Sequence, residues 1–139
     1  MTITLELFSF SFNEFDISDL PVDVDKIINV KDLVIDETPE MTAMIGTSRT
    51  IQDSLFKRPS VIRFYTNTIK EPVIRLIADY SRQPIDRQVE WMPLSVAIGC
   101  SDGLHLSVAF TEVLANELMS EYSDKITVKK RHLSLEYRL

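Results

Sequence analysis

The 139-residue chain has few cysteines, few glycines and no long apolar segment. Its single cysteine, Cys100, excludes an internal disulfide and cannot by itself form a structural zinc site. With only three glycines and six prolines, the chain is not collagen-like or of low complexity. No uncharged apolar run approaches the roughly 20 residues that span a bilayer. We expect one folded domain over residues 1–139, without a metal, a cofactor or a membrane span.

The chain also lacks a surplus of positive charge. Fifteen Lys and Arg residues face 21 Asp and Glu residues, which gives a net charge of −6 and argues against a general nucleic-acid binder. The first residues, MTITLELF, lack the basic start and long apolar core of a secretory signal. Together with the lone cysteine, this predicts a cytoplasmic protein.

The charge is unevenly spread along the sequence. Residues 1–40 hold ten acidic residues and two lysines, a balance of −8. Residues 125–139 hold five basic residues and one glutamate, a balance of +4, which includes the run Lys129, Lys130 and Arg131. These regions are either two solvated faces of one domain, or an acidic and a basic surface that meet charged partners.

The periodicity of apolar residues predicts an α/β domain. Residues 2–12 alternate as in a strand, with a change of parity at Leu7–Phe8 that predicts a bulge or a strand end. Residues 26–35 are β-branched and predict a second strand. Apolar residues recur at helical spacing over 49–82, and Pro72 suits the first turn of a helix.

The segment Leu94–Cys100 is almost wholly apolar, which is typical of a strand covered on both faces. A helical stripe over 107–119 and an alternating segment over 126–130 follow it. These three elements predict a βαβ unit. The element order predicts a single-domain α/β sandwich with a mixed, largely parallel sheet.

The turn after the strand Leu94–Cys100 is the candidate ligand site. Ligands of open α/β sheets bind beyond the carboxyl ends of the strands, where helix N-termini present free N–H groups. Gly99 and Gly103 permit tight turns, and the hydroxyl of Ser101 is placed to cap the next helix. The spacing matches neither a P-loop nor a dinucleotide fingerprint, so Ser101 and Asp102 either serve a ligand or only cap the helix.

No catalytic constellation is visible in the sequence. The two histidines and one cysteine provide no nucleophile–base pair and no metal-ligand spacing. Because Cys100 ends an apolar strand, we expect its thiol to be buried and structural. We therefore predict that the domain is not an enzyme.

Five segments resemble one bacterial family, in the same order and over essentially the whole chain. The central segment, VAIGCSDGLHLSV (96–108), resembles the pattern IAIGCTGGxHRSV, and RHLSLE (131–136) resembles RHRxLE. Upstream, LELFSFSF (5–12), INVKDL (28–33) and PEMTAM (39–44) resemble ESFGFKxG, FDVRFL and RPMTG. These segments resemble the C-terminal domain of RapZ, the RNase adapter protein of bacteria, and the resemblance predicts a stand-alone version of that domain, without the P-loop domain of full RapZ proteins.

The resemblance implies a fold akin to a phosphofructokinase subdomain. It also implies a non-catalytic regulatory domain that binds glucosamine-6-phosphate and engages a small RNA and its nuclease. The positions that carry over to a ligand site lie in the central motif, after the second strand and in the last motif. They are Lys31, Gly99, Cys100, Ser101, Asp102, Gly103, His105, Ser107, Arg131 and His132.

Five departures from the family pattern each make the local charge more negative. Asp102 replaces Gly, Leu106 and Leu133 each replace Arg, Ser11 replaces Lys, and Glu40 replaces Arg. Each lost charge-assisted phosphate contact removes about 1.5–3 kcal/mol of binding free energy. We therefore expect a diverged pocket that takes a neutral or weakly charged sugar or nucleotide.

Two further hypotheses concern macromolecular partners. The domain could instead be a protein-interaction or homo-oligomerisation module with a decayed pocket, using its acidic and basic surfaces. A third hypothesis is an RNA-binding adapter that uses Lys129, Lys130 and Arg131.

Overall fold

The computed structural model describes residues 2–33, 35, 39, 45–83 and 92–137. Its centre is a sheet of four strands in the order β2-β3-β1-β4, and every adjacent pair is parallel. The α/β prediction is confirmed, but the expectation of a mixed sheet is wrong among the described residues. The strands are β1 (Ile3–Ser11), β2 (Lys26–Asn29), β3 (Leu94–Cys100) and β4 (Ile126–His132).

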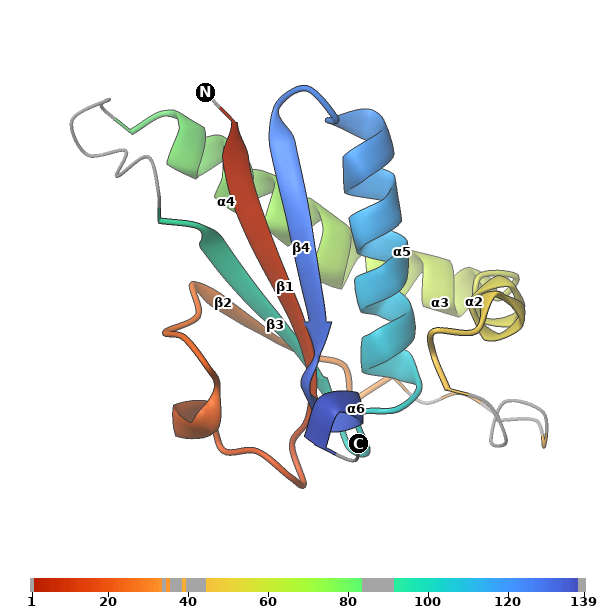
Figure 1. Ribbon diagram of the computed structural model, residues 1–139. Coiled ribbons are helices and arrows are strands. Elements are labelled where there is room, and N and C mark those ends of the chain that lie inside the picture. Colours follow the sequence, from red (N-terminus) through yellow and green to blue (C-terminus); the bar gives the residue numbers. More distant parts are fainter. Residues whose placement is uncertain (1, 34, 36–38, 40–44, 84–91, 138–139) are drawn as a thin grey trace.

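The connection from β1 to β2 explains why the sheet is parallel. The intervening segment contains a short 3₁₀-helix, η1 (Ile17–Asp19). It runs back along the sheet, so that β2 points in the same direction as β1 (Figure 1). A parallel pair needs a crossover of about a dozen residues, whereas a hairpin needs about two. In the sheet β2 pairs with β3, so the two strands that this crossover joins are not neighbours.

The predicted bulge at Leu7–Phe8 is also wrong. The pairing of β1 with β3 continues without interruption from Leu5 to Ser11. Apolar residues change from odd to even positions at Leu7–Phe8 because both faces of β1 are buried from Leu7 onward. Two apolar clusters cover these faces, so apolar residues at consecutive positions do not require the strand to shift its register.

Helices cover one face of the sheet (Figure 1). They are α2 (Arg49–Leu55), α3 (Pro59–Phe64), α4 (Glu71–Ser81) and α5 (Leu106–Glu121), with a π-helical segment, η2 (Tyr65–Lys70), between α3 and α4. The other face carries a smaller cluster that includes Phe8, Phe10, Leu20 and Leu133. The short helix α6 (Leu133–Tyr137), which the sequence did not predict, packs against β1.

Pro72 lies in the first turn of α4, as predicted, but α4 does not start a separate helix. Lys70 and Glu71 keep helical dihedral angles, and the Glu71 N–H donates to the carbonyl of Thr66, five residues earlier. Proline lacks the N–H of a regular helical turn and collides with the preceding one. The wider π turn just before Pro72 accommodates it within a continuous helix.

The predicted unit of strand, helix and strand is present as β3, α5 and β4. β4 does not pair with β3, because β1 lies between them. α5 packs against all three of these strands. No described helix is both long and apolar enough to cross a membrane.

Candidate functional site

The turn after β3 and the residues after β2 meet at one edge of the sheet. Parallel strands place their carboxyl ends together, so Lys31 comes close to the turn 101–105. The two segments enclose a cavity of about 130 Å³. Its lining residues are Lys31, Cys100, Ser101, Asp102, His105 and Leu106. Five of these six were predicted as site residues from the sequence.

Asp102 is the central polar group of this cavity. One carboxylate oxygen accepts the Leu104 N–H at 2.9 Å, and the other lies 3.2 Å from His105 Nδ1. Partial burial disfavours ionisation, but the Leu104 bond and the nearby His105 outweigh it and lower the pKa of Asp102. The cavity therefore contains a carboxylate at neutral pH.

Ser101 does not cap α5. The residue preceding the helix is His105, and no side chain makes a capping hydrogen bond there. The backbone carbonyl of Ser101 instead accepts the hydroxyl of Ser11 at 2.5 Å. The Ser101 side chain is exposed and lines the cavity.

The thiol of Cys100 belongs to the structure of the turn. Its Sγ accepts the Gly103 N–H at 3.1 Å and lies 3.0 Å from the hydroxyl of Ser107. Burial raises the pKa of Cys100, and these hydrogen bonds reduce that effect only in part. The thiol is therefore protonated at neutral pH, and Ser107 is itself fully buried.

Lys31 is oriented toward the turn by two contacts. Its backbone N–H donates to Asn29 Oδ1 at 2.8 Å, which shapes the chain just after β2. Its ammonium lies 4.7 Å from the centre of the Phe12 ring, a cation–π contact. Lys31 and Asp102 are thus a positively and a negatively charged residue that both line the cavity.

Two residues that were not predicted from the sequence, Gly46 and Gln52, support the turn 101–105 through hydrogen bonds. The Gly46 N–H donates to the Leu104 carbonyl at 2.7 Å, and Gln52 Nε2 donates to the Gly46 carbonyl at 2.9 Å. A Cβ on Gly46 would overlap the His105 carbonyl oxygen. The rarity of glycine in this chain was the only sequence signal for Gly46.

Arg131 and His132 do not line this cavity. Arg131 binds Glu136 in a bidentate ion pair, with a shortest distance of 2.9 Å, and borders a separate cavity of about 430 Å³. His132 lies between β1 and α5, with Nδ1 2.6 Å from the Ser9 hydroxyl and Nε2 3.6 Å from Glu112. The structure therefore separates this pair from the turn.

The basic run at 129–131 is largely neutralised by carboxylates. Lys130 pairs with Glu112 of α5, and Arg131 pairs with Glu136 of α6. Lys129 is the one residue of the run for which the described part of the chain provides no ion pair. The run is therefore less cationic in the fold than in the sequence.

The departures from the family pattern lie on both sides of the turn. Leu106 lines the cavity, whereas Leu133 is buried in the smaller apolar cluster. Ser11 is fully buried and uses its hydroxyl to bind the Ser101 carbonyl. Glu40 lies outside the described residues.

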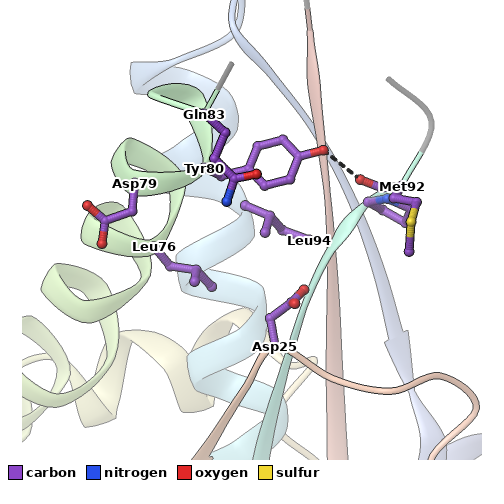
Figure 2. A pocket seen from close by; sticks show the side chains of 8 residues that line it. Asp25, Leu76, Asp79, Tyr80, Gln83, Met92 and Leu94 are labelled. Carbon is purple, nitrogen blue, oxygen red and sulfur yellow. Dashed lines mark hydrogen bonds between the residues drawn. The ribbon is translucent and has the colours of Figure 1, made fainter. Parts of the chain in front are cut away.

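A different cavity of about 330 Å³ lies between α4 and the start of β3 (Figure 2). The fold itself uses its polar groups. Asp25 accepts the Ser95 N–H at 2.8 Å, and the Tyr80 hydroxyl donates to the Met92 carbonyl at 3.0 Å. Asp79 points away from the cavity and pairs with Arg82. None of the predicted site residues lies there.

No group of three or more candidate metal ligands occurs in the described part of the chain.

The sequence matches one known family. The family described as the RapZ C-terminal domain matches residues 3–135. The chain belongs to this family. The predicted resemblance and the family's α/β fold are confirmed over nearly the whole sequence.

Longer bacterial proteins contain similar sequences. A "Nucleotide-binding protein" of Pediococcus pentosaceus is 30% identical over 113 residues, which are 81% of this chain and 36% of that protein. Proteins of the same name from Rhodococcus erythropolis and Mycobacterium tuberculosis are 28% and 26% identical, over 98% and 97% of this chain. The chain spans about two fifths of the length of these relatives, 42% and 41% in the last two.

Proposed function

We propose that this RapZ C-terminal domain is a non-catalytic, regulatory binding domain for a neutral or weakly charged sugar or nucleotide. The supporting observation is the cavity at the N-terminus of α5, which is lined by an ionised Asp102 and by Lys31. A carboxylate accepts hydrogen bonds from sugar hydroxyls, and an ammonium donates them. One group of each sign suits a ligand with hydroxyls and little net charge.

The same carboxylate disfavours a phosphate in the cavity. Two like charges at 4 Å repel by about 1 kcal/mol in water and about 4 kcal/mol near a protein surface. The N-terminus of α5 and Lys31 attract an anion, so Asp102 offsets part of that attraction. A cavity of about 130 Å³ holds only part of a sugar or nucleotide, and the rest extends into solvent.

The relatives support a small-molecule ligand. They are named nucleotide-binding proteins. The name describes whole proteins of which this chain matches about two fifths, so a nucleotide is one of two ligand classes in our proposal. A nucleotide would place its ribose hydroxyls against Asp102.

Thermal unfolding with a metabolite panel tests the proposal. The panel contains glucosamine, N-acetylglucosamine, glucosamine-6-phosphate, adenosine, AMP, UMP and inorganic phosphate. We expect a neutral sugar or a nucleoside to raise Tm by a few degrees, because a ligand at about ten times its Kd adds roughly 1.4 kcal/mol. The variant Asp102→Asn should reduce this shift, and Asp102→Gly should increase the shift caused by phosphorylated compounds.

The exposed acid Asp23 provides a matched control, because Asp23→Asn makes the same charge change outside the cavity. The proposal is wrong if no compound raises Tm at millimolar concentration. It is also wrong if Asp102→Asn and Asp23→Asn change the ligand response equally.

A second candidate function is protein interaction or homo-oligomerisation through β4. This strand is an edge of the sheet, and Lys129 on it is exposed. Light scattering and pull-down experiments would support this function if a dimer or a captured partner depends on Lys129. The RNA hypothesis requires a salt-sensitive complex with structured RNA that is lost when Lys129, Lys130 and Arg131 are reversed in charge.

A further inference from the structure

Another cavity, distinct from the three described above, lies at the end of the sheet opposite the candidate site. It is formed at the amino ends of β1 and β4, between α4 and the turn that follows α5 (Figure 1). Its volume is about 330 Å³, within the range of small-molecule pockets. Its lining residues are Ile3, Ile74, Ile77, Ala78, Ser81, Tyr122, Lys125 and Ile126.

The walls of this cavity are mainly apolar. Ile3 and Ile126 are buried ends of neighbouring strands and form its inner side. Ile74 and Ile77 of α4 are only partly buried, although Val73 in the same helix is fully buried. The apolar face of α4 thus extends past the core into the cavity. Covering such apolar surface with a hydrocarbon stabilises a complex through the hydrophobic effect.

One cation stands at the rim of the cavity. Lys125 is exposed, and no ion pair to it is found among the described residues. The turn that carries Lys125 is held in place, because its N–H donates to the Tyr122 carbonyl and its carbonyl accepts the Ile3 N–H, both at 2.9 Å. The position of Lys125 next to the apolar walls is therefore set by the backbone.

We propose that this cavity binds a small carboxylic acid with an unbranched hydrocarbon body. The hydrocarbon would lie against the isoleucines of α4 and the strand ends, and the carboxylate would face the Lys125 ammonium. An alcohol of the same length would gain the apolar contacts but no ion pair with Lys125, and an amine would be repelled by Lys125. This site is independent of the cavity at Asp102.

The test uses octanoate, octanol and octylamine with isotope-labelled protein, followed by the backbone amide resonances. Octanoate should shift the resonances of Tyr122, Lys125 and Ile126 and leave those of residues 101–105 unchanged. Octanol should bind more weakly than octanoate, and octylamine most weakly. Lys125→Gln should weaken octanoate binding roughly threefold, as expected for an exposed ion pair. Lys57→Gln, which removes an exposed charge elsewhere, should have no effect.

Filling the cavity provides the second arm of the experiment. Ala78 is partly exposed on α4, so Ala78→Phe adds a ring to the cavity and should abolish octanoate binding. If that variant does not fold, Ala78→Leu should weaken binding. The proposal is overturned if octanoate causes no shifts, shifts a different region, or binds no better than octylamine. It is also overturned if light scattering shows a dimer that Ala78→Phe dissociates, because a second copy would then fill the cavity.

Discussion

All three glycines of the chain are close-approach positions, and two of them directly shape the turn after β3. A Cβ on Gly46 would overlap the His105 carbonyl oxygen, and one on Gly99 would overlap the Phe12 ring. Gly103 has φ of 70° and lies against the side chain of Ser134. Gly99 and Gly103 therefore shape the site without lining the cavity.

We expect Gly103→Ala to lower the free energy of unfolding by about 1–3 kcal/mol. The left-handed φ strains any residue with a Cβ, and the new methyl group would collide with Ser134. Urea denaturation of the single and double variants measures both effects. Adding Ser134→Gly should recover the part due to the collision with Ser134, and leave the parts due to φ and to the close approach to the Ser11 backbone nitrogen.

Ser134→Ala alone is the control for this pair. The Ser134 hydroxyl is fully buried and has no hydrogen-bond partner among the described residues. Removing it should leave stability unchanged or raise it by about 1 kcal/mol. A loss of stability on this change would show that the hydroxyl has a partner in the native protein.

At the scale of elements, the π-helical segment η2, which lies between α3 and α4, makes side-chain contacts with α5. Tyr65 is buried, and its hydroxyl donates to the Glu117 carboxylate. Lys70 at the other end of η2 lies 3.2 Å from Glu117 and 2.8 Å from Glu121. Burial and the bond to Glu117 raise the pKa of Tyr65, so the phenol remains a donor over the whole working pH range.

We expect Tyr65→Phe to destabilise the protein by about 1.5–3 kcal/mol, because it removes a hydrogen bond to a charged acceptor. Glu117→Gln should also destabilise it, since it weakens the contacts to Tyr65 and Lys70. Denaturation of the two single variants and the double variant forms a thermodynamic cycle. Strictly additive effects would contradict a direct interaction between Tyr65 and Glu117.

At the scale of the whole molecule, His132 links overall stability to pH. It lies between β1 and α5 and is only 13% exposed. Burial lowers its pKa, and the neighbouring Glu112 opposes this only in part. Lys130 and Glu136 are the other charged groups that act on it. The folded protein therefore favours neutral His132 more than the unfolded chain does.

The sign of the pH dependence follows from this lowered pKa. The unfolded chain binds the proton first as pH falls below about 6.5, the ordinary pKa of histidine, so stability decreases from there until the folded group also titrates. We expect Tm of the native protein to decrease between pH 7 and pH 5. His132→Gln should flatten this dependence. Because the chain has only two histidines, His105→Gln is the matched control.

The sequence alone determined the family, the α/β class and most of the candidate site. The motif from Val96 to Val108 is contiguous, so one strand, one turn and one helix bring its residues close together along the chain. Lys31 was predicted from the family resemblance, and the fold brings it close to the turn because the carboxyl ends of parallel strands share one edge of the sheet.

Only the tertiary structure decided where the remaining charged residues act. Arg131 and His132 match the family motif, yet partners from β1, α5 and α6 hold them away from the turn. The all-parallel sheet, the continuous helix through Pro72 and the support from Gly46 also depend on which segments pack together. Local patterns report the neighbours of a residue along the chain, whereas these features depend on contacts between segments far apart in the sequence.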